Sequence, residues 1–314
     1  MKTIIAITHL VEDTQVDLVS HYAKKRNIGI VPICTNTVSF GSIALHQKRN
    51  RISLYSGKKL IVPAGLWFAT YPREDTLYSG KMSKYPYPGE YRSTVFQFVN
   101  DLRYAFSSIP HMPGVFDSIL KADSKLYVFK EAFKIGLRIP SETFNSNLET
   151  KRIMLGNRAQ YRKKLGFPSV VSFSCLSKKE EMITTTNSAT VKDSSFLLWQ
   201  WQTLVESIAH VRGFVVEDKS WFVSWKRESN LSLTIDLREG VEEREWIPFT
   251  MPESVSNKLT KLCKKLGIRF CCPEFLLNKK GELTLIDINP CGDWRGFFSD
   301  NTSNKIASAI ASLF

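Results

Sequence analysis

The sequence predicts a soluble protein of mixed α/β and α+β class, with two or three lobes in its 314 residues. Short strand patterns alternate with a helical pattern in the first third, and two β-hairpin patterns flank an amphipathic helix in the last third. Hydrophobic residues make up 43% of the chain and charged residues 23%, as in ordinary globular proteins. No apolar run is long enough to cross a bilayer, and the N-terminus lacks the core of a signal peptide. We therefore expect a folded cytoplasmic protein.

The first third of the chain is predicted to be an open α/β domain. Strand patterns at residues 2–8 and 29–34 flank a helical segment at residues 13–25, and further strand patterns lie at residues 51–55, 59–63 and 65–69. An amphipathic helix follows, with its apolar stripe at Val95, Phe98, Val99, Leu102 and Phe106. Pro110 and Pro113 end that helix, so we expect an N-terminal domain over residues 1–115.

Residues 116–200 are predicted to form a central lobe. Asp123 or Ser124 can cap a helix that Gly136 ends, with the apolar stripe Leu126, Phe129 and Phe133. A basic helix is expected next, followed by a strand at residues 169–176. The basic residues of that helix are Arg158, Arg162, Lys163 and Lys164.

Residues 201–314 are predicted to form a C-terminal lobe. A hairpin of residues 211–217 and 220–226 is expected to turn at Asp218 and Lys219. Pro252 and Gly267 bound an amphipathic helix with the apolar face Val255, Leu259, Leu262, Cys263 and Leu266. A second hairpin spans residues 272–277 and 282–288, and a short helix near residues 303–313 closes the chain.

The second hairpin is expected to bring three oxygen ligands together. If its turn leaves an even number of residues unpaired, either 279–280 or 280–281, strand alternation puts Glu274, Asp287 and Asn289 on one face. Two carboxylates and an amide oxygen suit Mg²⁺, which prefers hard oxygen donors and completes its shell with water and nucleotide phosphates. A merely solvated role fits Asp287 poorly, because its sequence neighbours are apolar.

The charge balance and the cysteines restrict the function further. Lys and Arg outnumber Asp and Glu by 43 to 30, and the surplus lies in residues 1–200, because residues 201–314 carry equal numbers of each. Such a surplus attracts an acidic peptide or a nucleic acid, or it simply keeps the surface solvated. The six cysteines show no paired CxxC spacing, so we expect reduced, mostly buried thiols rather than a zinc site or disulfides.

Four motifs, in this order along the chain, resemble those of the ATP-grasp ligases. They are Lys121-Ala-Asp-Ser-Lys125, Gly136-Leu-Arg-Ile-Pro140, Gln202 followed by Arg212, and the acidic hairpin from Pro273 to Pro290. The resemblance implies an ATP-grasp fold, in which the N-terminal, central and C-terminal lobes clasp ATP. It also implies the binding residues, with Lys125 and Arg212 at the phosphates, Gln202 at the hinge, Glu206 at the ribose, and Glu274, Asp287 and Asn289 at Mg²⁺.

Within that superfamily the sequence is most similar to the macrocyclases of graspetides, the microviridin type of ribosomal peptide. The similarity rests on Thr234-Ile-Asp236-Leu-Arg238, Trp246-Ile-Pro-Phe-Thr-Met-Pro252 and Asn289-Pro-Cys-Gly-Asp-Trp294. It implies that ATP phosphorylates an Asp or Glu side chain of a precursor peptide, and that a Thr, Ser or Lys side chain then closes an ω-ester or ω-amide ring. A homodimer is also implied.

The catalytic and peptide-binding candidates follow from this chemistry. Transfer of the γ-phosphoryl group requires positive charge around the developing negative oxygens, which Arg212 supplies beside Lys125 and the metal. Arg238 can clamp the substrate carboxylate, while Asp236 orients it or assists deprotonation of the hydroxyl; a plain surface ion pair is the alternative. The further candidates for holding an acidic leader and core peptide are Lys226, Arg227 and Arg295.

One departure from the family pattern leaves other functions open. Ser172 stands where the family has a second phosphate-binding Lys, so either Lys178 or Lys179 reaches in from the next turn or one Lys suffices. The alternatives are a ligase of the same fold that adds amino acids to a protein or to each other, and a catalytically silent relative. A basic nucleic-acid-binding protein is the alternative from another class, although no recognition motif is present.

Overall fold

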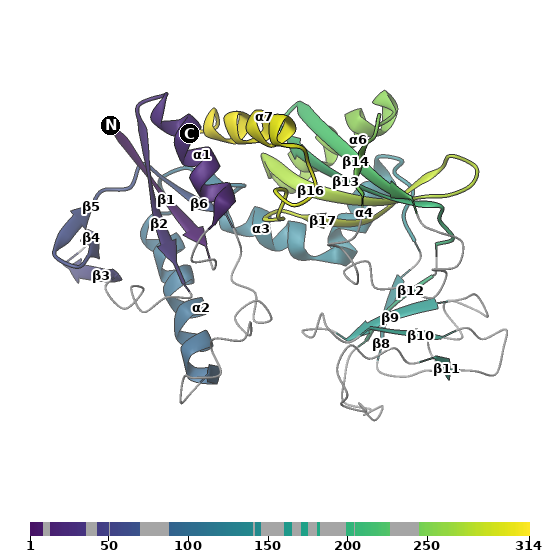
Figure 1. Cartoon of the computed structure of the whole chain (residues 1–314). Coiled ribbons are helices and arrows are strands. Elements are labelled where there is room, and N and C mark those ends of the chain that lie inside the picture. Colours follow the sequence, from purple (N-terminus) through teal and green to yellow (C-terminus); the bar gives the residue numbers. More distant parts are fainter. Residues whose placement is uncertain are drawn as a thin grey trace.

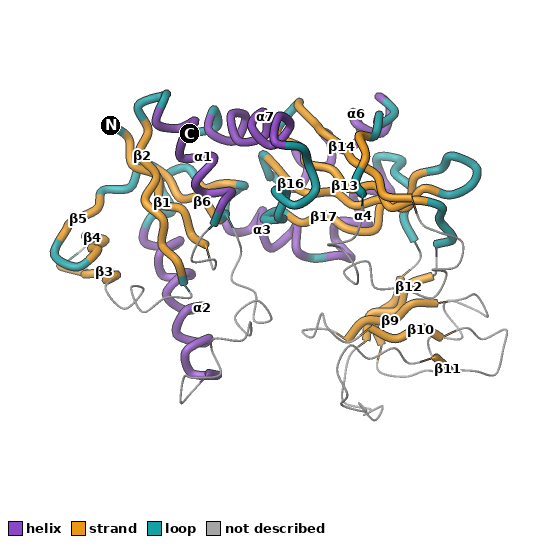
Figure 2. The backbone as a smooth tube through the Cα atoms, viewed as in Figure 1, coloured by secondary structure: helices purple, strands orange, loops and turns teal. Residues whose placement is uncertain are grey.

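The computed structural model describes residues 1–8, 13–35, 43–49, 51–69, 88–140, 142–145, 160–164, 171–174, 181–182, 199–203, 205–226 and 245–314. Within these residues the chain forms four β-sheets (Figure 1). The sheets from the N-terminal and C-terminal parts of the chain are joined by helices at the top of the molecule, whereas the sheet from the central part lies apart below them (Figure 2). No helix in the described ranges is long and apolar enough to cross a membrane.

The N-terminal sheet is parallel and has the strand order β2-β1-β6-β7. Its strands are β1 (Lys2–Thr8), β2 (Ile28–Cys34), β6 (Gly65–Phe68) and β7 (His111–Met112). Helix α1 (Thr14–Lys24) begins after Asp13, whose Oδ1 accepts hydrogen bonds from the backbone N–H groups of Gln15 and Val16 at 3.0 and 3.2 Å. The strands predicted at the start of the chain and the helix between them are confirmed.

A small antiparallel sheet and a long helix complete this part of the chain. The sheet is β3 (Ile43–Lys48), β4 (Arg51–Ser56) and β5 (Lys59–Ile61), of which β4 and β5 occupy predicted strand patterns. Helix α2 (Pro88–Ala105) contains the predicted stripe residues up to Leu102, of which Val99 and Leu102 are buried, whereas Phe106 follows the end of the helix. Val99 and Leu102 of α2 pack with Leu54 and Ile61 against one face of the N-terminal sheet.

The central sheet corrects one prediction. Its order is β11-β10-β9-β12-β8, built from β8 (Glu142–Asn145), β9 (Gln160–Lys164), β10 (Val171–Ser174), β11 (Glu181–Met182) and β12 (Trp199–Thr203). The predicted basic helix is wrong for Arg162, Lys163 and Lys164, which belong to strand β9 and pair with β10 and β12. Lysine and arginine are compatible with either a helix or a strand, so the pairing of β9 with β10 and β12 determines that this segment is a strand. Strand β10 lies within the strand pattern predicted for this region.

The C-terminal sheet is antiparallel, with the order β15-β14-β13-β16-β17. Its strands are β13 (Ala209–Val216), β14 (Lys219–Lys226), β15 (Ile247–Pro248), β16 (Phe270–Leu277) and β17 (Leu283–Asn289). Both predicted hairpins are present. The first turns at Glu217 and Asp218, one residue before the predicted turn, because Val216 pairs with Lys219 and Glu217 adopts a positive φ of 53°.

One face of this sheet is covered by three helices. They are α3 (Phe116–Asp123), α4 (Lys125–Lys134) and α6 (Glu253–Leu266), which share a buried cluster with the inward residues of β13, β16 and β17. Helix α6 begins and ends as predicted, with Pro252 as its N-cap and Gly267 in the left-handed region. The stripe predicted on α4 is wrong at Leu126 and Phe133, which are 53% and 70% exposed. Phe129 is buried as predicted, together with Val128, Glu131 and Ala132.

The opposite face of the C-terminal sheet shares a core with the N-terminal sheet. Helix α7 (Asp300–Ala311) packs against α1, and the two helices lie side by side above both sheets (Figure 1). The common cluster joins Ile4 and Trp67 of the first sheet to Phe214 and Phe270 of the second. The N-terminal and C-terminal lobes are therefore one packed body.

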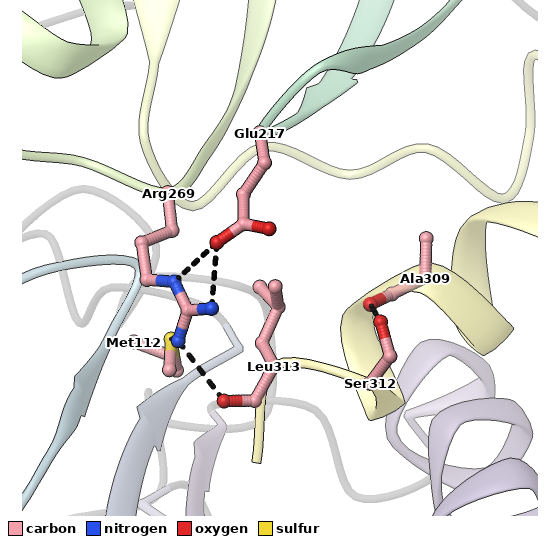
Figure 3. A network of polar contacts seen from close by, with 6 residues as sticks. All are labelled: Met112, Glu217, Arg269, Ala309, Ser312 and Leu313. Atoms are coloured by element: carbon pink, nitrogen blue, oxygen red, sulfur yellow. Dashed lines mark hydrogen bonds and ion pairs between the residues drawn. The ribbon is translucent and has the colours of Figure 1, made fainter.

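Arg269 strengthens this junction from its edge (Figure 3). Its Nε and Nη2 atoms donate to Glu217 Oε1 at 2.9 and 2.6 Å, and its Nη1 atom donates to the carbonyl oxygen of Leu313 at 3.0 Å. The same Nη1 atom lies 3.8 Å from the sulfur of Met112 in β7. The backbone N–H of Arg269 also donates to the carbonyl of Pro113 at 2.7 Å.

The described cysteines match the prediction of reduced thiols. No disulfide joins Cys34, Cys263, Cys271, Cys272 or Cys291, and all except Cys34 are buried. Cys175 lies outside the described residues.

Candidate functional site

Polar side chains gather on one face of the C-terminal sheet, across three neighbouring strands. Arg212 of β13 pairs with Glu274 of β16, and Glu274 pairs with Asp287 of β17. Asn289 lies two residues beyond Asp287, opposite Cys272, and therefore faces the same side. The structure thus brings the three predicted metal ligands to one face, beside Arg212.

The hairpin reaches this arrangement by a different turn from the one predicted. Leu277 pairs with Leu283, so the loop contains five residues, 278–282. With this odd number of loop residues, regular pairing would put Asp287 on the face opposite to Glu274. A register shift between Glu274 and Phe275 makes the correction, because β17 contributes one extra residue there. The wider loop is closed by Asn278, whose Oδ1 accepts hydrogen bonds from two backbone N–H groups further along the loop at 2.9 Å each.

Glu274 is surrounded by positive and hydrogen-bonding groups. Its Oε1 lies 3.5 Å from Arg212 Nη1, and its Oε2 lies 3.2 Å from His210 Nε2. Burial raises the pKa of Glu274, but the charge of Arg212, the hydrogen bond and charge of His210 and the charge of Lys125 together lower the pKa to about 2. The carboxylate is therefore ionised at neutral pH, as a metal ligand must be.

Arg212 is fixed by contacts outside the sheet. Its Nη2 donates to the carbonyl oxygen of Asp293 at 3.3 Å, and its guanidinium carbon lies 3.8 Å from the centre of the Phe297 ring. Only part of its side chain, 17%, is exposed. These contacts hold a permanent positive charge next to the two carboxylates.

The residues after Asn289 turn tightly beneath the site. The Oδ1 atom of Asn289 accepts a hydrogen bond from the backbone N–H of Cys291 at 3.0 Å. Gly292 is required here, because a Cβ atom would lie 2.6 Å from the sulfur of Cys272. Beyond it, the N–H of Trp294 donates to Gln15 Oε1 at 3.4 Å, which connects the site loop to α1 of the N-terminal lobe.

Some functional neighbours were not among the predicted site residues. His210, Trp246 and Phe297 surround Glu274 and Arg212: the His210 and Trp246 rings are 5.5 Å apart, and those of Trp246 and Phe297 5.3 Å apart. The sequence places His210 beside Arg212, because strand alternation puts both on the same face, although no catalytic role was assigned to it. Trp246 and Phe297 arrive from distant segments and carry no comparable signal.

The remaining predicted site residues are placed as follows. Lys125 is the first residue of α4 and is close enough to Glu274 to help lower its pKa. Glu206 is exposed on the segment between β12 and β13. Lys226 is exposed at the end of β14, and Arg295 Nη1 lies 4.0 Å from Asp300 Oδ1.

Other predicted residues can be located only by backbone or not at all. Gln202 lies in β12, paired with Glu142 and Tyr161, and Ser172 lies in β10, paired with Arg162. The residues that fall outside the described ranges are Arg158, Lys178, Lys179, Arg227, Asp236 and Arg238.

The donor set at this site fits Mg²⁺. Glu274 and Asp287 offer carboxylate oxygens and Asn289 offers an amide oxygen, which are the donors that Mg²⁺ takes in nucleotide sites. Among the described residues no group of three or more His, Cys, Asp and Glu side chains could hold a metal by itself. Three protein donors leave positions around Mg²⁺ that phosphate and water oxygens commonly fill.

Comparison with known proteins identifies the fold. No protein-family model and no curated protein matches the sequence. The macrocyclase MdnC from Microcystis aeruginosa MRC, bound with the precursor peptide MdnA, is 14% identical with a TM-score of 0.73, covering 99% of this chain and 98% of that one.

Two further structures give the same result. The RiPP-associated ATP-grasp ligase of Chryseobacterium gregarium, in complex with ADP and a leader and core peptide, is 18% identical with a TM-score of 0.72, covering 100% and 96% of the two chains. The ATP-grasp ligase PsnB, complexed with a phosphomimetic variant of its minimal precursor, Mg and ADP, is 13% identical with a TM-score of 0.67, covering 99% and 98%. The predicted ATP-grasp fold is confirmed.

Proposed function

We propose that this protein is an ATP-dependent peptide macrocyclase of the graspetide type. The observation that carries the proposal is the convergence of Glu274, Asp287 and Asn289 on one sheet face beside Arg212. The fold supports it, because this chain shares the ATP-grasp fold over nearly its whole length with ligases crystallised with precursor peptides. Its lobes are taken as residues 1–115, 116–200 and 201–314.

The nucleotide would bind between the central and C-terminal lobes. Mg²⁺ at Glu274, Asp287 and Asn289 would neutralise the β- and γ-phosphate oxygens of ATP. Lys125 and Arg212 supply further positive charge toward the transferred phosphoryl group. Gln202 of β12 in the central sheet and Glu206 on the segment between β12 and β13 are proposed to hold the adenosine.

The proposed reaction activates one side chain of the peptide for attack by another. An Asp or Glu carboxylate oxygen attacks the γ-phosphorus of ATP, which forms an acyl phosphate and releases ADP. A Thr or Ser hydroxyl, or a Lys amine, then attacks the acyl carbon and loses its proton, and inorganic phosphate leaves. Arg238, with Lys226, Arg227 and Arg295, would hold the acidic peptide, and Asp236 would orient it or accept the proton.

The test is incubation with ATP, Mg²⁺ and a short acidic peptide that carries Asp or Glu together with Thr, Ser or Lys side chains. We expect ADP release that depends on the peptide, and loss of the mass of one water molecule per ring. A gain of mass from added amino acids would assign the protein to the other class of ATP-grasp ligase. No ADP release with any such peptide would indicate a silent relative.

The assembly and its surroundings are part of the proposal. We expect a homodimer in the cytoplasm, which sedimentation of the purified protein and cell fractionation can check. The positive surplus of residues 1–200 is proposed to guide an acidic precursor, so that its affinity falls as salt is raised. Equally salt-sensitive binding of DNA or RNA, without peptide-dependent ADP release, would favour the nucleic-acid-binding alternative.

A further inference from the structure

An aromatic pocket lies next to the candidate site. Its volume is about 400 Å³, within the range of pockets that hold small ligands, and it is formed between β14, the start of α6 and the start of α7. Rings make up much of its wall, namely those of Trp221, Trp246, Phe249 and Phe297. Nothing in the proposed reaction uses this pocket so far.

The pocket and the candidate site share two rings. Trp246 lines the pocket and also meets the edge of His210, with ring centres 5.5 Å apart. Phe297 lines the pocket and also lies beneath the guanidinium of Arg212 at 3.8 Å. A group bound in the pocket would therefore lie one ring away from the residues that surround Glu274.

The residues that line the pocket favour a neutral ligand. Among the described residues that line the pocket, none is acidic or basic. Its polar side-chain groups are the indole N–H groups of Trp221 and Trp246 and several hydroxyls, of which the Oγ atoms of Ser220 and Ser256 lie 3.2 Å apart. The carboxylate that is activated cannot be the group bound here, because nothing in the described wall compensates its charge.

We propose that this pocket binds an aromatic side chain of the peptide substrate. This inference rests on the proposed function and adds a specificity to it, namely a Phe, Tyr or Trp close in sequence to the activated Asp or Glu. Aromatic side chains fit such a wall, because edge-to-face contacts with Trp and Phe rings favour them over aliphatic ones. The hydroxyls can also accept or donate a hydrogen bond at the polar tip of Tyr or Trp.

A small probe tests the pocket without ATP or a precursor. N-acetyl-L-phenylalaninamide is titrated into protein labelled with ¹³C at the methionine methyl groups, with N-acetyl-L-alaninamide as the comparison. Met251 lines the pocket, whereas Met112 is buried at the junction of the two lobes. We expect a saturable shift of the Met251 signal with the aromatic probe alone, and no shift of Met112.

Matched substitutions on α6 show whether the probe occupies the pocket. Ser256→Phe fills it, whereas Asn257→Phe adds the same ring at the next, exposed position. We expect the affinity for the aromatic probe to fall at least tenfold in Ser256→Phe and to stay unchanged in Asn257→Phe. Ser220→Phe on β14 gives a second filled variant in case Ser256→Phe does not fold, and an unchanged Met112 signal shows that a variant is folded.

Each outcome separates this inference from the proposed function. No Met251 shift in the unsubstituted protein, or equal binding by Ser256→Phe, overturns the pocket assignment even if the enzyme cyclises its precursor. Binding of the probe by a protein that never releases ADP with a peptide overturns the assignment of the pocket to a peptide substrate. Selective, pocket-dependent binding together with ring closure supports both.

Discussion

Arg212 is the residue on which the local charge balance of the candidate site depends. It lies directly opposite Glu274, contacts Phe297 through its ring face and donates to the Asp293 carbonyl. A lysine could not reproduce these contacts, because its ammonium group is a point charge without a flat surface. The ionised Glu274 is thus set beside one fixed cation, while Asp287 faces it from the next strand.

The role of Asp287 can be tested with a substitution of nearly the same shape. Asp287→Asn removes one negative charge from the donor set, so we expect Mg²⁺-dependent ADP affinity to fall by roughly 10- to 100-fold or more. Isothermal titration calorimetry with and without Mg²⁺ measures this. Asp218→Asn, in the exposed turn between β13 and β14, serves as the control and should change nothing. Unchanged affinity in Asp287→Asn would remove this residue from the metal site.

Because His111 is buried, its protonation should make the free energy of unfolding depend on pH. Burial lowers its pKa below 6.5 and the charge of Arg103 adds to this, although the hydrogen bond to the carbonyl of Phe106 acts in the opposite direction. A proton therefore binds more easily to the unfolded chain, so the free energy of unfolding should fall as the pH drops below 6.5. Urea denaturation at a series of pH values measures the slope.

His111→Phe is expected to flatten this slope, whereas His21→Phe on the exposed side of α1 should leave it in place. A slope that is the same in both variants would show that other groups are responsible.

At the scale of elements, local signals predicted α1 and α6 well. Asp13 caps the first, and Pro252 and Gly267 bound the second, so each helix end was visible in a few residues. Strand β9 was mistaken for a helix, because its neighbours β10 and β12 come from later in the chain. The stripe of α4 failed for the same reason, since the side of the helix that faces α6 cannot be known from α4 itself.

In the candidate site too, local sequence predicted some features, whereas others depend on contacts between distant segments. Alternation along β16 and β17 correctly grouped Glu274, Asp287 and Asn289, although the turn and the register shift between them were not predicted. The positions of Trp246 and Phe297 depend on how segments far apart in the chain meet. The roles of Asp236 and Arg238 remain predictions, because both lie outside the described residues.

The end of α6 offers a test of backbone strain. Gly267 and Gly281 both have positive φ values, 74° and 79°, but a Cβ atom at Gly267 would meet the hydroxyl of Ser118, whereas Gly281 has open space. We expect Gly281→Ala to cost about 1–2 kcal/mol of unfolding free energy, the price of the left-handed conformation. Gly267→Ala should cost more, because Ser118 must also move.

Chemical denaturation of the two variants gives the comparison. Losses of equal size would mean that the contact with Ser118 adds nothing to the strain.

At the scale of the whole molecule, the N-terminal and C-terminal lobes are joined far more extensively than either is to the central sheet. Helices α1 and α7 pack together over a hydrophobic cluster that contains residues of both the N-terminal and the C-terminal sheet. Among the described residues, the chain enters the central sheet through the segment before β8 and leaves it through the segment after β12 (Figure 1). This arrangement places the face that carries Glu274, Asp287 and Asn289 on the packed two-lobe body.

Substitutions at Arg269 and Glu217 measure how much the contacts of Arg269 contribute to the stability of the two-lobe body. Arg269→Met removes the hydrogen bond to the Leu313 carbonyl as well as the pair with Glu217, so we expect a loss of about 1–3 kcal/mol. Glu217→Gln affects only the half-exposed pair and should cost less than about 1 kcal/mol. Thermal and chemical denaturation measure both variants. Equal losses would show that the contact with Leu313 is unimportant.

The packing of α7 on α1 also has a consequence for how the protein is made. The first lobe leaves the ribosome early, yet residues that cover one face of its sheet belong to a helix translated after nearly 300 others. Until that helix emerges, Ile4 and Trp67 lack part of their final surroundings. The first lobe therefore reaches its final packing only after α7 has been made.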